Sequence, residues 1–484
     1  MPWEVWRNHE QDEYHEDMAL DRQIQGRSVL IAGAGLAGLA AAADLQDRGA
    51  TVTVVEARNR VGGRVWTLRD EWAHGQHAEA GGDLIDEDQQ EIRQIAARLG
   101  LTLRPILRGG FGFAADRGER RQPRLFKKGS GRWRRLSETL GPWIREYRLS
   151  DQRWGGLVAH TMARMSVSDW LKAVKADEEL QAFARGLRGF FLADADDLSL
   201  LMLVDQFAAD VPGRGRMYRI EGGNDRLATA LAGMLGDRVQ LTTQVISVTQ
   251  SSNAVRVRVR TDDGTEADMT AEYVILAVPA TTLRHIVCRP ALPVEQEKAI
   301  VNLKYGKATR TVLQFGRRFW RHRGWPNAFG TDLPIGAVWD GNEEQKGRNG
   351  ILSFLAGGSA SLETQRMLAR GGVEELAHAV RWLGAKLGAK EEPVIASRVV
   401  SWEHDPWAGG GYAYFDSSYD PAWRPLLAHP HGRVLFAGEH TSLHWQGYMN
   451  GAVESGLRAA AEVHALACGA PRDHLRSPSR RSLR

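Results

Sequence analysis

The chain has 484 residues, which is enough for two domains that each bury a hydrophobic core. Its formal net charge of +4 is too small to indicate a nucleic-acid partner, and its only cysteines, Cys288 and Cys468, lie outside any CxxC motif. This cysteine usage excludes a disulfide framework and suits a reducing compartment. The first 27 residues contain no secretory signal, and no apolar run approaches 18 residues, so we expect a cytoplasmic protein without a membrane anchor.

The first predicted elements form a dinucleotide-binding motif. Ser28 to Ala32 is typical of a short buried strand, Leu36 to Leu45 of an alanine-rich helix, and Val52 to Val55 of a second buried strand. In the GxGxxG motif between strand and helix, the first glycine permits a tight turn and the second lets the backbone approach a pyrophosphate. The third lets helix and strand pack closely, and the helix start directs N–H groups at the diphosphate. The candidate cofactor-binding residues here are Gly33, Gly35, Leu36, Ala37 and Gly38.

The motif continues beyond the second strand. Glu56 lies about 20 residues after Gly35, where a carboxylate can accept hydrogen bonds from a ribose and disfavours the 2′-phosphate of NADP. Arg58 and Arg64 could neutralise a diphosphate, while Gly62 and Gly63 let the backbone cross close to the cofactor. We therefore add Glu56, Ala57, Arg58, Gly63 and Arg64 to the candidate cofactor-binding residues.

Apolar periodicity predicts the later elements. In chain order these are helices at Asp169–Val174, Asp177–Leu187, Leu198–Ala208 and Asn224–Leu235, strands at Val239–Val248, Val255–Arg260, Tyr273–Leu276, Thr311–Phe315, Ala337–Trp339 and Ile351–Phe354, and helices at Val373–Leu387 and from Tyr448 through Ala461.

Further motifs follow along nearly the whole chain. They are the E-A-R-x-R-x-G-G-R run that begins at Glu56, then Glu79–Gly82, Arg219–Gly223, Val274–Pro279, Trp402, Ala408–Tyr412, Phe436–Thr441, Trp445–Met449 and Gly451–Gly456. In this set and order the chain resembles the flavin-containing amine oxidase family, which includes monoamine oxidase, polyamine oxidase and L-amino-acid oxidase. The resemblance implies FAD as the cofactor, a small amine as the substrate and O2 as the electron acceptor, reduced to hydrogen peroxide.

The predicted fold is α/β, with a doubly wound, Rossmann-like FAD-binding domain and an interleaved α+β substrate domain. We expect flavin and substrate to meet in a cleft between them. The FAD-binding domain is assigned to residues 28–105, 217–290 and 395–469, the substrate domain to 106–216 and 291–394, a polar extension to 1–27 and a basic disordered tail to 470–484.

The resemblance also implies roles for residues at the reaction centre. Tyr412 and Tyr448 match two aromatic rings that hold an amine before the flavin, and such a pair favours the neutral amine by desolvation. Trp402 would pack against the isoalloxazine, and the helix start at Met449 would face the flavin edge where negative charge develops on reduction. Further cofactor-binding residues implied here are Gly81, Gly82, Asp83, Leu84, Val245, Trp402, Gly438, Glu439, Gly447, Tyr448 and Met449.

Two positions depart from the pattern of the family. Gly411 stands where monoamine oxidases carry the cysteine that attaches flavin, so we expect the FAD to be non-covalently bound. Arg310 stands where the family places a lysine that holds a water against flavin N5, and it completes the candidate catalytic set with Tyr412, Tyr448 and Trp402. Because arginine is a bulky, permanently charged fork, a slow oxidase or another electron acceptor remains open.

The sequence leaves the substrate open. Asp83 and Asp86, just after Gly81–Gly82, favour an amine without an α-carboxylate; they could also meet the second ammonium group of a diamine, or lie on a surface loop. The alternatives are L-amino-acid oxidase chemistry, a flavin-dependent desaturase, a flavoprotein dehydrogenase and a non-catalytic FAD-binding protein. His440 and His444 are four residues apart, but no third ligand is visible and no metal site is predicted. A homodimer is left open.

Overall fold

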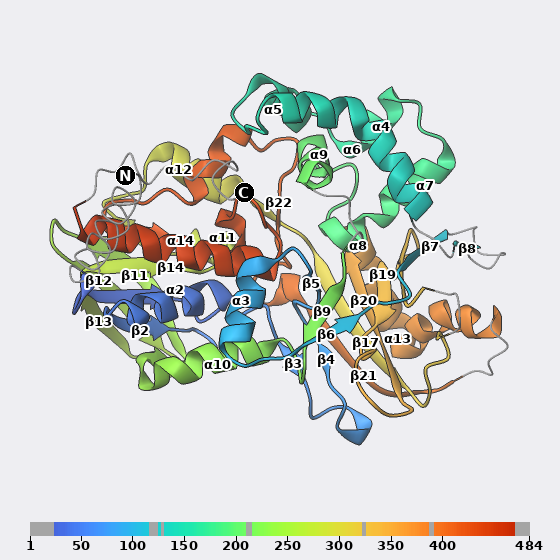
Figure 1. The fold of residues 1–484 in the computed structure, drawn as a ribbon, viewed down its shortest axis with the longest axis horizontal. Helices are drawn as coiled ribbons and strands as arrows, with labels where there is room; N and C mark the ends of the chain where they lie inside the picture. The colour runs from blue at the N-terminus through green and yellow to red at the C-terminus, as the bar shows by residue number, and fades with distance from the viewer. Residues whose placement is uncertain are drawn as a thin grey trace, which may run out of the picture.

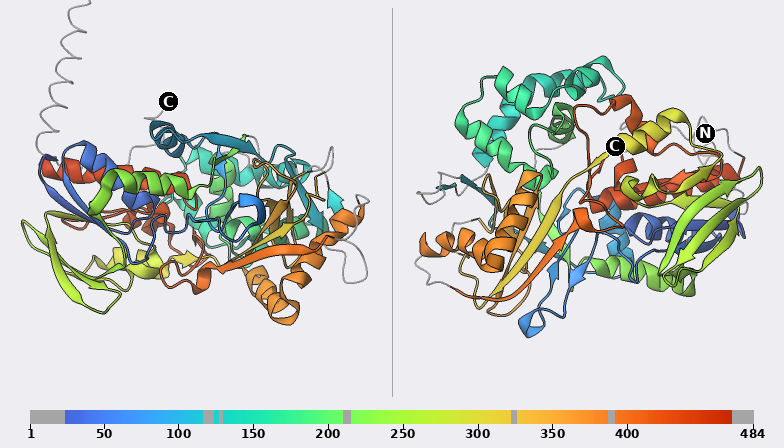
Figure 2. Two further views of the ribbon diagram at one scale, coloured as in Figure 1. Left: turned by 90° about the horizontal axis from the view of Figure 1, so that it is seen from below. Right: turned by 180° about the vertical axis from the view of Figure 1, so that it is seen from behind.

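The computed structural model describes residues 24–115, 124–126, 130–209, 215–321, 326–386 and 392–469. Figures 1 and 2 show a parallel sheet on one side of the molecule, a larger mixed sheet on the other, and a group of helices along one edge. Residues 1–23 of the predicted extension and the predicted tail at 470–484 lie outside the described residues. Within the described part, no helix combines the length and apolar character needed to span a bilayer.

The parallel sheet has five strands in the order β10-β2-β1-β14-β23. Its central strands are largely apolar because both faces are covered, one by helices and the other by the valines of a second, largely antiparallel sheet. α14 packs along α2, and at their contact a Cβ on Gly456 would overlap the carbonyl oxygen of Ala37, so glycine there allows the close approach. The strands are β1 (Ser28–Ala32), β2 (Thr51–Val55), β10 (Val239–Gln240), β14 (Tyr273–Leu276) and β23 (Val434–Phe436), with α2 (Leu36–Asp47), α3 (Gln90–Arg98), α10 (Asp225–Leu235) and α14 (Met449–Ala467).

A second, four-stranded sheet in the order β13-β12-β11-β15 lies next to the parallel one. In it β12 alternates buried valines with exposed arginines, as a half-buried strand does. The predicted single strand Val239–Val248 is wrong: β10 pairs with β2, whereas β11 pairs with β12, and Thr242 between them has φ of +53°. The bounds are β11 (Thr243–Gln250), β12 (Val255–Thr261), β13 (Glu266–Ala271) and β15 (Val287–Arg289). The short helices α11 (Ala280–Leu283) and α12 (Val294–Asn302) lie in the same half of the molecule.

The mixed sheet has seven strands in the order β21-β17-β20-β19-β18-β7-β8. The interior strand β17 is buried along its whole length, and the predicted strand cores at 311–315, 337–339 and 351–354 lie in β17, β19 and β20 of this sheet. β21 pairs with β17, so residues 394–401 belong to this sheet, although the sequence places residues from 395 onward in the FAD-binding domain. The bounds are β7 (Phe111–Ala115), β8 (Arg124–Phe126), β17 (Ala308–Phe315), β18 (Ala328–Thr331), β19 (Ala337–Asp340), β20 (Gly350–Gly357), β21 (Val394–Ser401) and α13 (Ser359–Lys386), which breaks at Gly372.

The helical group occupies most of the first predicted substrate segment. Ser166 and Asp177 cap α6 and α7 by accepting hydrogen bonds from Asp169 N and Leu180 N, so local sequence fixes where these helices begin. The buried side chains of Trp170 and Phe207 lie in its core. The helices are α4 (Ser130–Leu149), α5 (Leu157–Ala163), α6 (Val167–Ala173), α7 (Glu178–Gly186), α8 (Arg188–Phe191) and α9 (Leu200–Ala209).

Small sheets connect these parts. A three-stranded sheet in the order β5-β9-β6 joins residues just after the glycine-rich arm to the end of the helical segment. There are also two antiparallel strand pairs, β3 with β4 and β16 with β22. Their strands are β3 (Thr67–Leu68), β4 (Ala78–Glu79), β5 (Ile85–Asp86), β6 (Leu103–Ile106), β9 (Met217–Ile220), β16 (Lys304–Tyr305) and β22 (Ala413–Tyr414).

Candidate active site

A cavity of about 1820 Å³ runs from the carboxyl ends of β1 and β2 to the mixed sheet and the helical group. This is where an open α/β sheet is expected to hold a ligand. All the candidate residues from the sequence line it except Gly38. A Cβ on Gly38 would overlap the carbonyl oxygen of Gly33, so Gly38 serves the packing of α2 on β1.

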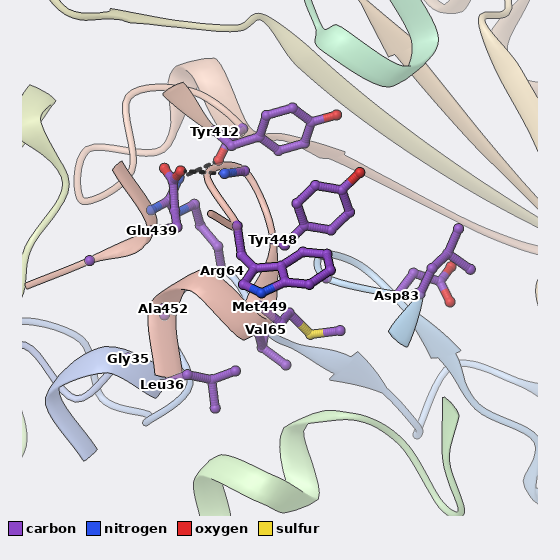
Figure 3. A pocket seen from close by; sticks show the side chains of 18 of the residues that line it. Gly35, Leu36, Arg64, Val65, Asp83, Tyr412, Glu439, Tyr448, Met449 and Ala452 are labelled. Atoms are coloured by element: carbon purple, nitrogen blue, oxygen red, sulfur yellow. Dashed lines mark hydrogen bonds and ion pairs between the residues drawn. The ribbon is translucent and has the colours of Figure 1, made fainter. Parts of the chain in front are cut away.

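The glycine-rich turn forms one end of the cavity. Gly33 has φ of +102°, a conformation that other residues rarely adopt. A Cβ on Gly35 would meet no atom within 4 Å, so the backbone there is open towards the cavity (Figure 3). Glu56 accepts hydrogen bonds from Ala34 N at 2.8 Å and Arg58 N at 2.9 Å, and its burial raises the pKa of its carboxyl. This open, glycine-lined end fits the diphosphate and ribose of a dinucleotide.

The two candidate arginines of this arm, Arg58 and Arg64, are paired with carboxylates. Arg58 makes a bidentate ion pair with Asp405, at 2.6 and 2.7 Å. Arg64 donates to the carbonyl oxygen of Gly411 at 2.5 Å and to Glu439 at 3.0 Å. Their charges are therefore balanced within the protein, and they fasten segments from the far end of the chain to the glycine-rich arm.

Glu439 has a second task that its place in the sequence did not reveal. Besides Arg64, its carboxylate accepts hydrogen bonds from Ala413 N at 3.2 Å and Gly447 N at 2.8 Å. These two amides directly adjoin Tyr412 and Tyr448. A single buried carboxylate thus fixes the backbone of both tyrosines relative to each other.

Tyr412 and Tyr448 lie one above the other, with their rings extending towards the same side of the cavity (Figure 3). The helical group holds both hydroxyls: Tyr412 donates to the carbonyl oxygen of Phe190, and Gln206 hydrogen-bonds Tyr448. Burial raises the pKa of both phenols. The two rings are consequently held in place and remain neutral.

The short segment 80–83 organises the floor of this end. Trp402 donates its indole N–H to the carbonyl oxygen of Ala80 at 2.9 Å, and Arg310 donates to that of Gly81 at 2.8 Å. A Cβ on Gly82 would lie 2.8 Å from the sulfur of Met449. The segment therefore brings three candidate residues from distant parts of the chain against one stretch of backbone.

Asp83 lies in a buried charge network and not on a surface loop, so that alternative is wrong: its side chain is 2% exposed. It pairs with Arg219, accepts a hydrogen bond from the Trp339 indole at 2.7 Å, and lies 3.6 Å from Arg310. The Arg310 guanidinium also lies 4.5 Å from the Trp339 ring centroid, and burial lowers its pKa. The sequence singled out neither Arg219 nor Trp339 for this network, although Arg219 stands in one of the family motifs.

The position of Gly411 leaves no room for a side chain. A Cβ there would overlap Leu192 and lie 2.9 Å from the Cβ of Ala308. Cys288 lies in β15 and Cys468 directly after α14, and neither lines the cavity. Burial also raises the pKa of the Cys288 thiol to about 11, which makes it unreactive.

The two histidines four residues apart do not meet in a ligand set. His440 is buried, and that burial lowers its pKa to about 3, whereas His444 contacts Glu454 at 3.1 Å. Across the ranges the structure describes, no group of three His, Cys, Asp or Glu side chains could hold a metal ion.

Known proteins resemble the chain in sequence and in fold. The sequence profile of the family described as flavin containing amine oxidoreductase matches residues 36–464. Amine oxidase [flavin-containing] B of Sus scrofa is 28% identical over 465 residues, covering 90% of this chain and 86% of the relative. Among solved structures, cyclohexylamine oxidase from Brevibacterium oxydans has a TM-score of 0.77 at 23% identity, and putrescine oxidase bound to putrescine has 0.77 at 24%. Each covers 91% of this chain and 99% of its own, and at this identity they show the shared fold.

Proposed function

The chain belongs to the flavin-containing amine oxidoreductase family, and we propose that it is an oxidase of amines that carry no α-carboxylate. Enzymes of this family act on CH–NH groups with FAD. Bound FAD would accept a hydride from the amine α-carbon at N5 and pass two electrons to O2, giving an imine and hydrogen peroxide. Water would then hydrolyse the imine to an aldehyde or ketone.

The residues that line the cavity fit FAD without a covalent bond. The open backbone at Gly35 and the Glu56 carboxylate suit the nucleotide end, and Val245 lines the same end. Trp402, Met449 and Gly82 would surround the flavin ring at the other end. Because Gly411 offers neither a thiol nor space for one, we propose that FAD is held by these contacts alone.

The observation that carries the proposal is the tyrosine pair in the same cavity as the glycine-rich arm. Tyr412 and Tyr448 would hold the amine between two apolar ring faces and exclude water from it. In that desolvated space the neutral amine is favoured over its ammonium form, and only the neutral form has the lone pair that assists loss of hydride. The backbone N–H groups at the start of α14 would stabilise negative charge beside them.

The charge balance of the cavity disfavours an amino acid as substrate. An α-carboxylate needs a cation near the tyrosine pair. Arg64 and Arg310 are the candidate arginines there, and they are already paired with Glu439 and Asp83. We therefore place amines before amino acids, and L-amino-acid oxidase chemistry is the alternative.

The identity of the electron acceptor is the second point to test, because Arg310 favours an acceptor other than O2. Its guanidinium is held by Gly81, Ser353 and Asp83, in place of the lysine that the family uses near the flavin. A dehydrogenase that passes electrons to another acceptor is the second candidate.

A substrate panel that follows flavin bleaching and oxygen consumption separately tests both points. We expect amines to bleach the purified yellow protein without air and to consume oxygen in air, and amino acids to do neither. Bleaching by amines without oxygen consumption would support the dehydrogenase, and bleaching by amino acids alone would contradict the proposal. Acid precipitation should release all the FAD; yellow precipitate would contradict non-covalent binding.

A further inference from the structure

The cavity wall near Tyr412 carries a charged pair that the proposed reaction leaves without a task. Arg310 lies on the interior strand β17 and is 4% exposed, and Asp83 directly follows Gly82, which contacts Met449. Both line the cavity, and their charged atoms are 3.6 Å apart. Arg310 also interacts electrostatically with Tyr412, which places its charge near the amine-binding rings.

The charge of Arg310 cannot be removed by loss of a proton. Arginine stays protonated in proteins even where burial lowers its pKa. A lone buried cation on this wall would attract a carboxylate and repel an ammonium group strongly, because few water molecules screen it. Its hydrogen bonds to Gly81 and Ser353 orient the guanidinium but bring no negative charge.

Asp83 supplies the negative charge that balances Arg310, and it shares this charge with a second arginine. Its other cationic partner, Arg219, also binds Glu344 at 2.9 Å, so two arginines face two carboxylates. Glu344 binds Arg219 but does not line the cavity. Asp83 is thus the carboxylate of this set that offsets Arg310 at the cavity wall.

We propose that Asp83 determines substrate specificity by neutralising Arg310, so that the cavity accepts neutral amines and rejects molecules that carry a carboxylate. This inference rests on the proposed function, in which the substrate is an amine without an α-carboxylate. Asp83 acts through Arg310 and is a positioning residue for the charge balance of the wall.

The variant Asp83→Asn tests this because it removes the charge with the smallest change of shape. Its single oxygen can still accept from Arg219 or from Trp339, whereas its NH2 group faces the other N–H group. The probes are benzoate and its neutral analogue benzamide, with dissociation constants measured by calorimetry on the FAD-loaded protein. We expect Asp83→Asn to strengthen benzoate binding relative to benzamide by about tenfold or more. Glu344→Gln is the matched control, since it removes the other carboxylate of Arg219; it should leave the ratio within about twofold.

Two further variants keep the test decisive if Asp83→Asn does not fold. Arg310→Gln leaves Asp83 in excess at the wall and should weaken benzoate relative to benzamide by about tenfold. The double variant Asp83→Asn/Arg310→Gln should return the ratio to the wild-type value. An unchanged ratio in Arg310→Gln, or equal changes in Asp83→Asn and Glu344→Gln, would overturn the inference.

Anaerobic bleaching by 2-phenylethylamine and phenylalanine, which differ only by the carboxylate, separates this inference from the proposed function. If the wild-type protein is bleached by phenylalanine alone, the proposed function fails whatever the ligand ratios show. If it is bleached by 2-phenylethylamine and the ratios do not respond to Asp83→Asn or Arg310→Gln, only the role of Asp83 fails.

Discussion

The two ends of the cavity are built in different ways. The nucleotide end consists largely of one continuous stretch, from β1 through the glycine-rich turn to Arg64, which Arg58 and Arg64 tie to Asp405 and Glu439. The reaction end brings together the floor at 80–83, the two tyrosines and residues from α8, α9, β9, β17 and β19. A continuous motif keeps its geometry wherever it occurs. The reaction end instead depends on charges and hydrogen bonds that are balanced only when distant segments meet in the fold.

The largest effect should come from breaking the local motif. Gly38→Ala would force a Cβ into the carbonyl oxygen of Gly33, so α2 must move away from β1. We expect a loss of about 3 kcal/mol in the free energy of unfolding, measured by urea denaturation, together with loss of the yellow colour.

Gly35→Ala sharpens this prediction, since its Cβ would meet no protein atom within 4 Å. It should unfold at the wild-type urea concentration but bind FAD about 10- to 100-fold more weakly, because the methyl group occupies space meant for the cofactor. Equal destabilisation by both changes would contradict the assignment of Gly38 to packing and of Gly35 to cofactor binding.

The assembled end should fail differently, in activity and not in stability. Replacing both Tyr412 and Tyr448 by alanine should lower kcat/KM for amines by about 100-fold, because the amine is no longer held in line with the flavin. The FAD content should stay unchanged. Tyr419→Phe is the control: Tyr419 is a buried tyrosine outside the cavity lining, and its hydroxyl makes no hydrogen bond.

Sequence reasoning succeeded where structure is local. The bounds of β1 and β14 are those predicted, and α2 begins at the predicted Leu36. It failed at Val239–Val248, because strand-like residues on both sides of the polar run 242–244 do not show that the chain changes sheets at Thr242. At the site, single residues were found through motifs, but their partners were not.

The partners of Asp83 explain why. Arg219, Arg310 and Trp339 are far from it in sequence and from one another, so no spacing rule could pair them. Their pairing depends on how the mixed sheet and the three-stranded sheet lie relative to the segment 80–83, which periodicity does not encode. The sequence does place charged residues in segments that become buried, and a buried charge requires a partner.

The buried charges of the assembled end also predict a smaller, pH-dependent effect. Glu79 lies next to this network and accepts hydrogen bonds from Thr67 and Asn224 N, both at 2.9 Å. Burial, with a further contribution from Asp83, raises its pKa to about 8. The folded state therefore keeps the proton that the unfolded state releases as the pH rises above the ordinary glutamate pKa of 4.5. Stability from this group is complete below that value and is lost as the pH rises towards about 8.

Glu79→Gln should remove this dependence, because the amide mimics the protonated acid without titrating. The difference in free energy of unfolding, variant minus wild type, should grow by about 1 kcal/mol per pH unit between pH 5.5 and 7.5, measured by urea denaturation at each pH. The exposed Glu146→Gln should leave the wild-type profile unchanged. If Glu79→Gln differs from wild type by the same amount at both pH values, the carboxylate is already ionised in the folded protein. The charge network around Asp83 would then carry one negative charge more than its contacts indicate.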